Sequence, residues 1–471
     1  MAERLLFLTG HLAQPRLEKI LMSMQPSPFE WSVINIGVKV AALMSEAIIL
    51  RRLPRPLNAD RVIVPGRCRA DLMRLAGEFG VPFERGPDEL KDLPSFFGRG
   101  GRVVDLSRYE ARIFAEIIDA PALSVDSILA KAAQLQAAGA DVIDIGCLPD
   151  TSFLQLEDAV RALKSAGFRV SVDSANADEL RRGAVAGADF LLSLTCDTLD
   201  LIEGTAAVPV LVPVTHGDTD SLLRAGEIAD KRGVPAIFDP ILDPVHFGFM
   251  ASLERYATVR RRLPQAEILM GTGNLTELTD ADSGGVTALL LGVCSELRVN
   301  NILTVQVSPH TRRTIQEHDA ARRLMYAAKQ DQSLPKDYGR ALLQLHDRFP
   351  FPNTAAEISE MAAMVKDLNF RIETAADGIH VYNRRGHHVT QDAFSLFPKL
   401  AVSHDGPHAF YLGAELMKAE IAWRLGKRYA QDEPLDWGCG VDLGPVDKDR
   451  FKEAGHTLRR RTLESRSDDD D

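Results

Sequence analysis

Short apolar runs alternate with amphipathic stretches through the middle of the chain. The runs show little alternation of apolar and polar positions, which is the pattern of strands buried on both faces of a parallel sheet. The stretches between them have helical periodicity, and residues 124–138 end at Gly139, a helix stop signal. The pattern predicts eight strands, at residues 113–118, 142–145, 169–172, 190–194, 208–214, 236–238, 268–270 and 302–307.

Eight strand–helix units in this order predict the α/β fold class and a (β/α)₈ TIM barrel, which typically uses about 250 residues. The predicted barrel spans residues 110–335. A doubly wound open sheet is the alternative, but such sheets more often have about five to seven strands and a glycine-rich first turn. In a TIM barrel the active site lies at the C-terminal ends of the strands, so the residues that follow each predicted strand are the candidates for function.

The first 105 residues predict a separate small α/β domain. Strands are expected at 4–10, 31–38 and 61–64, and helices at 17–24 and 71–78. The segment FFGRGGR at 96–102 is rich in Gly and Arg. We interpret it as a linker in preference to a phosphate-binding loop, because turn glycines are far more common than phosphate loops.

The pattern changes again after residue 335, and residues 345–440 predict a C-terminal α+β appendage. A helix is expected at 355–368, a hairpin of 370–373 with 378–382, and a second helix at 410–425 that ends at Gly426. Residues 441–471 are strongly charged and end in RSDDDD. Such a tail is usually solvated and disordered, so it is given no function.

Composition narrows the class of protein. The 471 residues carry a net charge of −11, which disfavours a nucleic-acid surface. No apolar stretch approaches the length of a membrane-spanning helix, and the N-terminal run MAERLLFLTGHL lacks the basic start and cleavage site of a signal peptide. The five cysteines are scattered and never form CxxC. We therefore expect a cytoplasmic protein with reduced thiols and no metal site of recognisable ligand spacing.

Polar side chains gather where the predicted strands end. Asp144 and Asp173 follow apolar runs in which an unpartnered carboxylate is costly, so each needs an internal partner or a ligand. For Ser174, Asp197 and Asp218 we favour helix capping over a functional role. The remaining candidates after later strands are Thr195, His216, Asp239, Asn274, Arg312 and Arg313.

Asp173 and Asp239 together indicate a specific kind of ligand. A pterin or similar pyrimidinone ring presents an amino group beside a ring N–H, and a carboxylate accepts two such hydrogens side by side. Asn274 can both donate and accept, which suits neighbouring ring nitrogens. A buried polar site of this kind discriminates well, because a ligand without the matching groups leaves it unsatisfied.

Several motifs at these strand ends resemble the pterin-binding barrel family, which comprises dihydropteroate synthases and pterin-dependent methyltransferases. The resemblance covers about 200 residues in the middle of the chain, as the barrel of one domain would. The motifs are GADVIDIG at 139–146, RVSVDS at 169–174, AVAGADFLLSLT at 184–195, FDPILDP at 238–244 and GTGNLTEL at 271–278.

The resemblance implies roles for individual residues. Asp173 and Asp239 would hold the pterin ring, Asn274 would face its other edge, and Asp144 would belong to the same site. Thr195 stands where the family usually has Asn. The chain departs from dihydropteroate synthases at two places: residues 273–276 replace the segment that carries a pterin-contacting Lys, and Gln306 and Ser308 replace an Arg-x-His pair that grips diphosphate.

Because of these departures, diphosphate would be held by His216, Arg312, Arg313 or the N-terminal domain, or else the reaction is not folate synthesis. The whole three-part chain resembles the dihydropteroate synthase-related proteins of methylotrophs and methanogens that are associated with tetrahydromethanopterin synthesis and one-carbon metabolism. The segment 408–438 contributes to that likeness.

The resemblance implies a transferase that joins a dihydropterin-6-methyl diphosphate to an arylamine, in that route a ribofuranosylaminobenzene phosphate. Mg²⁺ would bridge phosphate oxygens and a carboxylate. The expected partners are these small molecules, with no nucleic acid and no membrane, and a homodimer is left open. Two alternatives remain: a methyltransferase that uses a methylated pterin and a corrinoid partner, and a non-catalytic pterin-binding subunit.

Overall fold

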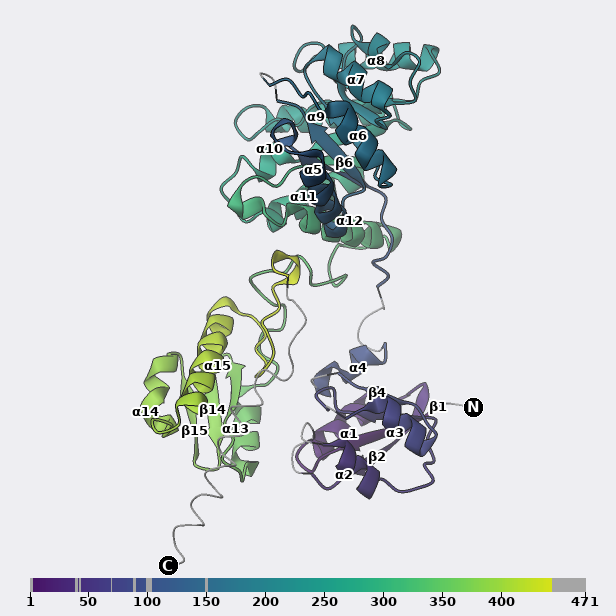
Figure 1. Cartoon of the computed structure of the whole chain (residues 1–471). Coiled ribbons are helices and arrows are strands. Elements are labelled where there is room, and N and C mark those ends of the chain that lie inside the picture. Colours follow the sequence, from purple (N-terminus) through teal and green to yellow (C-terminus); the bar gives the residue numbers. More distant parts are fainter. Residues whose placement is uncertain are drawn as a thin grey trace, which may run out of the picture. The chain divides into compact units, whose positions relative to one another are not determined.

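The computed structural model of the chain describes residues 3–38, 41, 44–68, 70–87, 90–98, 104–148 and 151–442 (Figure 1). These residues fall into two compact units. One comprises residues 104–344 together with 437–442. The other comprises the described residues before 104 together with 345–436.

Residues 104–344 contain a closed barrel of parallel strands, so the predicted (β/α)₈ TIM barrel is confirmed. The barrel closes where β12 pairs with β5, with Thr304 opposite Ala115. In barrel order from the first strand, the strands are β5 (Arg112–Ile117), β6 (Val142–Gly146), β7 (Val170–Asp173), β8 (Phe190–Leu194), β9 (Val208–Leu211), β10 (Ile237–Phe238), β11 (Glu267–Gly271) and β12 (Asn301–Thr304).

Helices connect successive strands of the barrel, and a large apolar cluster fills the layer between helices and strands. A second, smaller cluster fills the barrel interior and includes Phe114, Val142, Phe190, Ile237 and Leu269. The rings of Phe114 and Phe190 meet edge to face inside it. The helices are α5 (Val125–Ala138), α6 (Leu156–Ser165), α7 (Ala177–Ala186), α8 (Thr219–Lys231), α9 (Phe249–Arg262), α10 (Gly273–Thr276), α11 (Ser283–Leu297) and α12 (Thr314–Gln330).

The N-terminal part is the expected small α/β element, with a parallel sheet of order β2-β1-β3-β4. The short strand β4 and the helix α2 were not predicted. Most of the predicted linker, 99–102, lies outside the described residues. The elements are β1 (Glu3–Thr9), α1 (Gln14–Ser23), β2 (Phe29–Asn35), α2 (Glu46–Arg52), β3 (Arg61–Val64), α3 (Leu72–Phe79), β4 (Phe83–Arg85) and α4 (Leu93–Phe96).

The C-terminal part forms a three-stranded antiparallel sheet with helices, and the expected hairpin is its first strand pair. The third strand, β15, was not predicted. The charged tail from residue 443 lies outside the described residues. Among the described helices, none combines the length and apolar character needed to cross a membrane. The elements are α13 (Ala355–Met364), β13 (Arg371–Ala375), β14 (Gly378–Asn383), β15 (Gly386–Thr390), α14 (Phe397–Leu400) and α15 (Gly406–Leu425).

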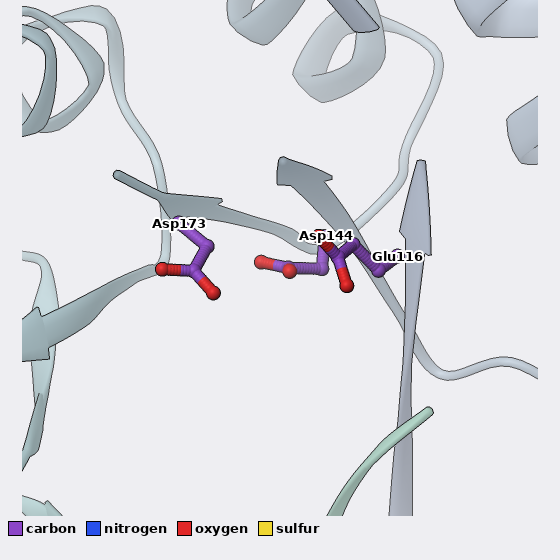
Figure 2. A group of neighbouring side chains, drawn as sticks. All are labelled: Glu116, Asp144 and Asp173. Carbon is purple, nitrogen blue, oxygen red and sulfur yellow. The ribbon is translucent and has the colours of Figure 1, made fainter. Parts of the chain in front are cut away.

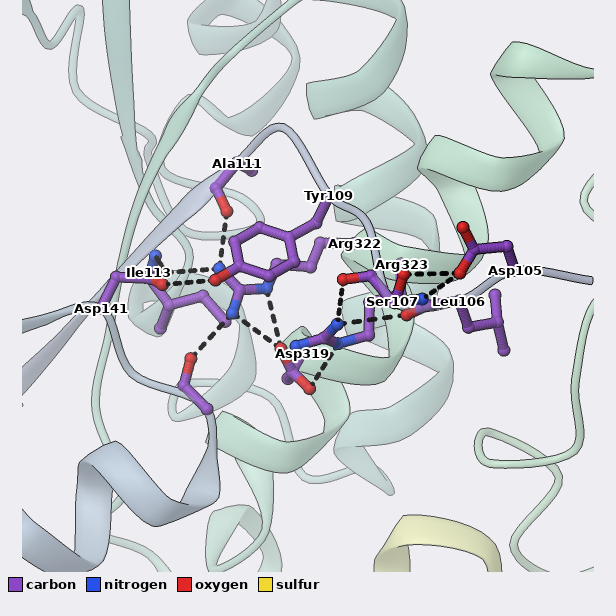
Figure 3. A network of polar contacts seen from close by, with 11 residues as sticks. Asp105, Leu106, Ser107, Tyr109, Ala111, Ile113, Asp141, Asp319, Arg322 and Arg323 are labelled. Carbon is purple, nitrogen blue, oxygen red and sulfur yellow. Dashed lines mark hydrogen bonds and ion pairs between the residues drawn. The ribbon is translucent and has the colours of Figure 1, made fainter.

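A polar network ties the first strand of the barrel to its last helix at the N-terminal end of the strands (Figure 3). Arg322 of α12 is fully enclosed; it donates to the carbonyl oxygens of Ala111 and Gly139 and pairs with Asp141. The ring of Tyr109 lies 3.5 Å from its guanidinium carbon. These contacts fasten α12 against β5 and the turn before β6, which fixes the barrel closure.

Candidate active site at the C-terminal ends of the strands

Four carboxyl groups line the C-terminal mouth of the barrel. Glu116 lies two residues after Phe114 on β5, and Asp144 lies two residues after Val142 on β6. Residues two apart share a face of a strand, so both carboxyl side chains point inward above the apolar cluster of the interior. Asp173 ends β7, and Asp239 directly follows β10. The strand register places Glu116 opposite Asp144. The mouth is therefore strongly acidic, and an apolar layer lies beneath it.

Burial raises the pKa of each of these four groups, and repulsion between carboxylates adds to the effect for Asp144 and Asp173. Burial, with the charges of Glu116 and Asp239, raises the pKa of Asp173 to about 7. Burial raises the pKa of Asp239 to about 6. Burial also raises the pKa of Glu116, and it raises that of the fully enclosed Asp144 furthest, with added repulsion from Asp173. Asp173 and Asp239 come from the C-terminal ends of two separate strands, and the charge of Asp239 contributes to the raised pKa of Asp173.

Asp239 is held by two hydrogen bonds to one of its oxygens. The hydroxyl of the buried Tyr256 donates to Oδ1 at 2.7 Å, and the backbone N–H of Ile241 donates to the same atom at 2.8 Å. Both bonds favour the ionised form and offset part of the effect of burial on the pKa. The second carboxyl oxygen, Oδ2, has no hydrogen bond to a described residue and is available to a ligand.

The loop after Asp239 is clamped from α9. Arg255 donates to the carbonyl oxygens of Pro240 and Ile241, at 3.0 and 2.8 Å, and forms an ion pair with Asp243 at 2.7 Å. Ile241 has φ of 66°, a left-handed conformation that a β-branched residue rarely adopts. Such strain persists only where surrounding contacts over-determine it, so Arg255 fixes the backbone that presents Asp239.

The structure places the other predicted ring contacts in less direct roles. The side-chain amide of Asn274 donates to the carbonyl of Leu242 at 2.7 Å, so it braces the Asp239 loop from α10. Thr195 accepts from the N–H of Asp197 and takes part in a turn with Thr198 after β8. Neither contact tests binding to a ring, and that expectation stays a prediction.

The three candidate phosphate contacts differ in their exposure and in the hydrogen bonds and ion pairs that they already form. His216 is exposed, and its Nε2 lies 3.2 Å from Asp243. Arg312 is exposed and donates to the carbonyl of Pro309 at 3.1 Å. Arg313 pairs with Asp442 at 2.6 Å and donates to the carbonyl of Cys439 at 3.0 Å. Arg313 therefore holds the segment 437–442 against the barrel, and Arg312 is the more accessible of the two arginines.

The expected helix caps are partly correct. Asp218 caps α8 by accepting from the N–H of Ser221, as predicted. The prediction for Ser174 is wrong, because α7 is capped by Asn176 and the Ser174 hydroxyl donates to Glu179 at 2.6 Å. Asp197 is exposed and precedes the 3₁₀ turn that begins after Thr198, so it caps no helix either.

Two residues of the site were missed by sequence reasoning. Glu116 lies within an apolar strand, and a charged residue inside such a run was the available signal. Tyr256 lies on α9, where the aromatic position reads as ordinary core, and no local signal marks its hydroxyl. Glu116, Asp144 and Asp173 each place a carboxylate oxygen within 4.8 Å of the others. Such an all-oxygen set fits a hard divalent cation such as Mg²⁺.

A buried histidine supports the strand end that precedes Asn274. His318 is fully enclosed: one ring nitrogen bonds the carbonyl of Thr314 at 2.7 Å and the other the hydroxyl of Thr272 at 2.9 Å. Burial lowers its pKa to about 4 from an ordinary 6.5. The unfolded chain therefore binds a proton between pH 6.5 and 4 that the folded chain does not, so stability falls as pH drops through this window.

We expect a His318→Gln variant to lose this acid sensitivity. The wild type should lose about 3 kcal/mol of unfolding free energy between pH 7 and pH 4 through this group. Urea unfolding at a series of pH values measures it. His216→Gln is the control, because that side chain is exposed. An unchanged pH dependence in the His318 variant would show that another group is responsible.

A separate cavity lies at the opposite end of the barrel from the acidic mouth. Its volume is about 380 Å³, and its lining includes Ala111, Asn300 and Lys329. Ala111 and Asn300 precede β5 and β12, so the cavity opens at the N-terminal ends of the strands. Lys329 is paired with Glu110 at 2.7 Å. This cavity is separate from the acidic mouth.

Known proteins resemble this chain over different parts of its length. The model of a family of unknown function (DUF6513) matches residues 3–88. An uncharacterized protein of Methanocaldococcus jannaschii is 26% identical over 524 residues, covering 92% of this chain and 99% of the relative.

Solved dihydropteroate synthases are similar to about half of the chain. The structure from Yersinia pestis is 18% identical, with a TM-score of 0.37, and the match covers 48% of this chain and 95% of that one. The structure from Thermus thermophilus in complex with 6HMPPP is 20% identical, with a TM-score of 0.37, and the match covers 47% and 95%.

Proposed function

We propose that the protein is a transferase that joins a dihydropterin-6-methyl diphosphate to an arylamine and releases diphosphate. The observation that carries the proposal is the pair Asp173 and Asp239, which face one barrel mouth and form no ion pair among the described residues. A carboxylate accepts the adjacent amino and ring N–H hydrogens of a pterin side by side. The arylamine in this proposal is a ribofuranosylaminobenzene phosphate, and the pathway is tetrahydromethanopterin synthesis.

In the proposed reaction the arylamine nitrogen attacks the exocyclic methylene carbon of the pterin. A C–N bond forms, the C–O bond to diphosphate breaks, and the amine nitrogen gives up a proton. The barrel contributes by orienting the ring through Asp173 and Asp239, so that the methylene and the amine meet in a productive geometry. Arg312 and His216 are the exposed groups proposed to contact phosphate.

Mg²⁺, when bound, would neutralise phosphate oxygens and ease departure of the diphosphate. The carboxylates of Glu116, Asp144 and Asp173 are the residues proposed to hold it, because hard divalent cations prefer oxygen ligands. The acidic mouth needs such a partner, since an anionic diphosphate would otherwise be repelled by four nearby carboxyl groups.

Purified full-length protein mixed with the dihydropterin diphosphate, Mg²⁺ and either 4-aminobenzoate or the ribofuranosylated arylamine tests the proposal. We expect diphosphate release that depends on an arylamine, and a condensed product detected by mass spectrometry. Tight pterin binding without release would support the non-catalytic binding subunit instead. Transfer of a methyl group from methyl-tetrahydropterin to a corrinoid protein would support the methyltransferase alternative.

Because Asp239 must be ionised to accept hydrogens from a pterin, its protonation state should make pterin binding depend on pH. With a pKa of about 6, Asp239 is ionised above that pH, and binding should weaken as pH falls below it. Tyr256→Phe removes a hydrogen bond that favours the ionised form, so the midpoint should move upward by about one pH unit. Fluorescence titration of pterin between pH 5 and 8 measures this shift.

Asp173, with a pKa of about 7, adds a second step to the same titration. The Tyr256 variant should move that step much less than the first, because Tyr256 bonds only Asp239 among the described residues and can affect Asp173 only through the charge of Asp239. A midpoint that stays unchanged in Tyr256→Phe, or moves downward, would contradict the proposed role of Asp239.

A further inference from the structure

Three carboxyl groups on neighbouring strands converge on one point of the barrel mouth. Glu116, Asp144 and Asp173 come from β5, β6 and β7, and each offers an oxygen within 4.8 Å of the others. Figure 2 shows Asp144 between the other two, with the three carboxyl groups turned toward a common space. The register, with Glu116 opposite Asp144 and Gly146 opposite Asp173, sets this arrangement.

One oxygen of the central carboxylate lacks a partner. Asp144 is completely enclosed; its Oδ1 accepts from the hydroxyl of Ser171, whereas its Oδ2 is buried with no hydrogen-bond partner. An unsatisfied buried charge costs several kcal/mol, so native proteins rarely leave one without a ligand. None of the described Lys, Arg or His residues forms an ion pair with the three carboxyl groups. The missing partner of Oδ2 must therefore come from outside the chain or be a proton.

The neighbouring backbone also makes room for Glu116 in this position. A Cβ atom on Gly146 would lie 2.5 Å from Oε1 of Glu116. Any larger residue at 146 would push the Glu116 carboxyl group out of the cluster. The glycine thus keeps the third carboxylate beside the unpartnered oxygen of Asp144.

We propose that Glu116, Asp144 and Asp173 form a resident site for a divalent cation, which the protein binds before any substrate. The three ligands are all carboxylates, which suits Mg²⁺, Mn²⁺ or Ca²⁺ and does not suit the softer metals that prefer Cys or His. In an octahedral Mg²⁺ site neighbouring ligand oxygens lie about 3 Å apart and opposite ones about 4.2 Å, so the three oxygens, which lie within 4.8 Å of one another, would draw closer together around a bound cation. Waters complete the coordination on the open side of the mouth.

The cation site deepens the proposed transferase function and rests on it for its purpose. A bound cation offsets the repulsion that the carboxyl groups exert on an incoming diphosphate and leaves open coordination positions for its oxygens. Asp173 can serve both ligands, because a carboxylate has two oxygens with separate lone pairs. Binding of the pterin diphosphate should therefore depend on the cation, whereas binding of an uncharged pterin should depend on it much less.

The test is a titration of the full chain with Mn²⁺ in the absence of any pterin. Electron paramagnetic resonance measures the bound Mn²⁺, and Mg²⁺ and Ca²⁺ serve as competitors. We expect one Mn²⁺ per chain that Mg²⁺ displaces. Asp144→Asn and Glu116→Gln should each weaken Mn²⁺ binding at least tenfold. Asp218→Asn is the matched control, because this exposed carboxylate caps a helix at the same end of the barrel and Asn also caps well.

Thermal unfolding with and without Mg²⁺ gives a second readout. The melting temperature of the wild type should rise when Mg²⁺ is added. Without metal, Asp144→Asn should melt at a higher temperature than the wild type, and adding Mg²⁺ should not raise its melting temperature further. Equal Mn²⁺ affinity in wild type and both variants, or no stoichiometric Mn²⁺ at all, would overturn the cation site. Stoichiometric Mn²⁺ binding without turnover of any pterin would instead count against the transferase proposal alone.

Discussion

Asp239→Asn is expected to weaken binding of a dihydropterin by about 100- to 10,000-fold. The free oxygen of the carboxylate, Oδ2, has two lone pairs and is proposed to accept both ring hydrogens, and each hydrogen bond to a charged group is worth about 1.5–3 kcal/mol. The variant amide keeps the oxygen that accepts from Tyr256 and Ile241, so folding should be nearly unaffected. Its NH₂ group, however, would face the hydrogens of the ring. Isothermal titration calorimetry with a dihydropterin measures the loss.

Asp218→Asn provides the matched comparison for this experiment. It makes the same chemical change at the same end of the barrel, in a side chain whose oxygen caps α8. Because Asn caps helices as well as Asp does, pterin affinity in this variant should equal that of the wild type. Wild-type affinity in Asp239→Asn would show that the ring, if it binds at all, does not contact Asp239.

The barrel was predictable because its strands are buried on both faces and read as continuous apolar runs, as residues 268–270 of β11 do. The ends of the strands were harder to predict. The apolar run of β9 continues through Pro213, but the strand stops at Leu211, because Pro213 has no N–H to donate to a neighbouring strand. The strand β15 contains Gly386, His387 and His388, and no periodicity separates such a polar sequence from a turn.

The site could be predicted only where chain position alone places a residue at the mouth. Asp173 and Asp239 directly follow apolar strands, so the barrel interpretation was enough to bring them to one end. Glu116 belongs to the site because the strand register places it opposite Asp144 on the next strand. That register cannot be predicted from the sequence alone. For Tyr256, only the packing of α9 against β10 brings its hydroxyl to Asp239.

Arg322 shows that a residue important for stability can also be missed when only the sequence pattern is considered. Helical periodicity places this arginine among the charged residues of α12, a helix in which Arg323 and Lys329 are partly exposed. Its guanidinium nevertheless contacts the carbonyl of Ala111, a residue 211 positions earlier in the chain. A buried role of this kind follows from barrel closure, which brings the first strand and the last helix together.

We therefore expect Arg322→Met to destabilise the barrel by about 3–5 kcal/mol, the usual cost of removing one partner of a buried ion pair. The substitution keeps an unbranched apolar stem against Tyr109, but it leaves Asp141 and Asp319 without their shared cation and the carbonyls of Ala111 and Gly139 without a donor. Urea unfolding measures the change, and hydrogen exchange of peptides from β5 and β6 assigns it to the barrel.

Arg161→Met is the control, because Arg161 is 59% exposed on α6 and forms one ion pair with Asp158 at 3.5 Å. An exposed pair of this kind is worth about 1 kcal/mol at most. If Arg322→Met lowered stability no more than this control does, the network at the N-terminal end of the strands would be dispensable, and closure would depend on the β12–β5 ladder alone. Faster exchange confined to β5, β6 and α12 would instead identify Arg322 as the residue that locks the two ends of the barrel together.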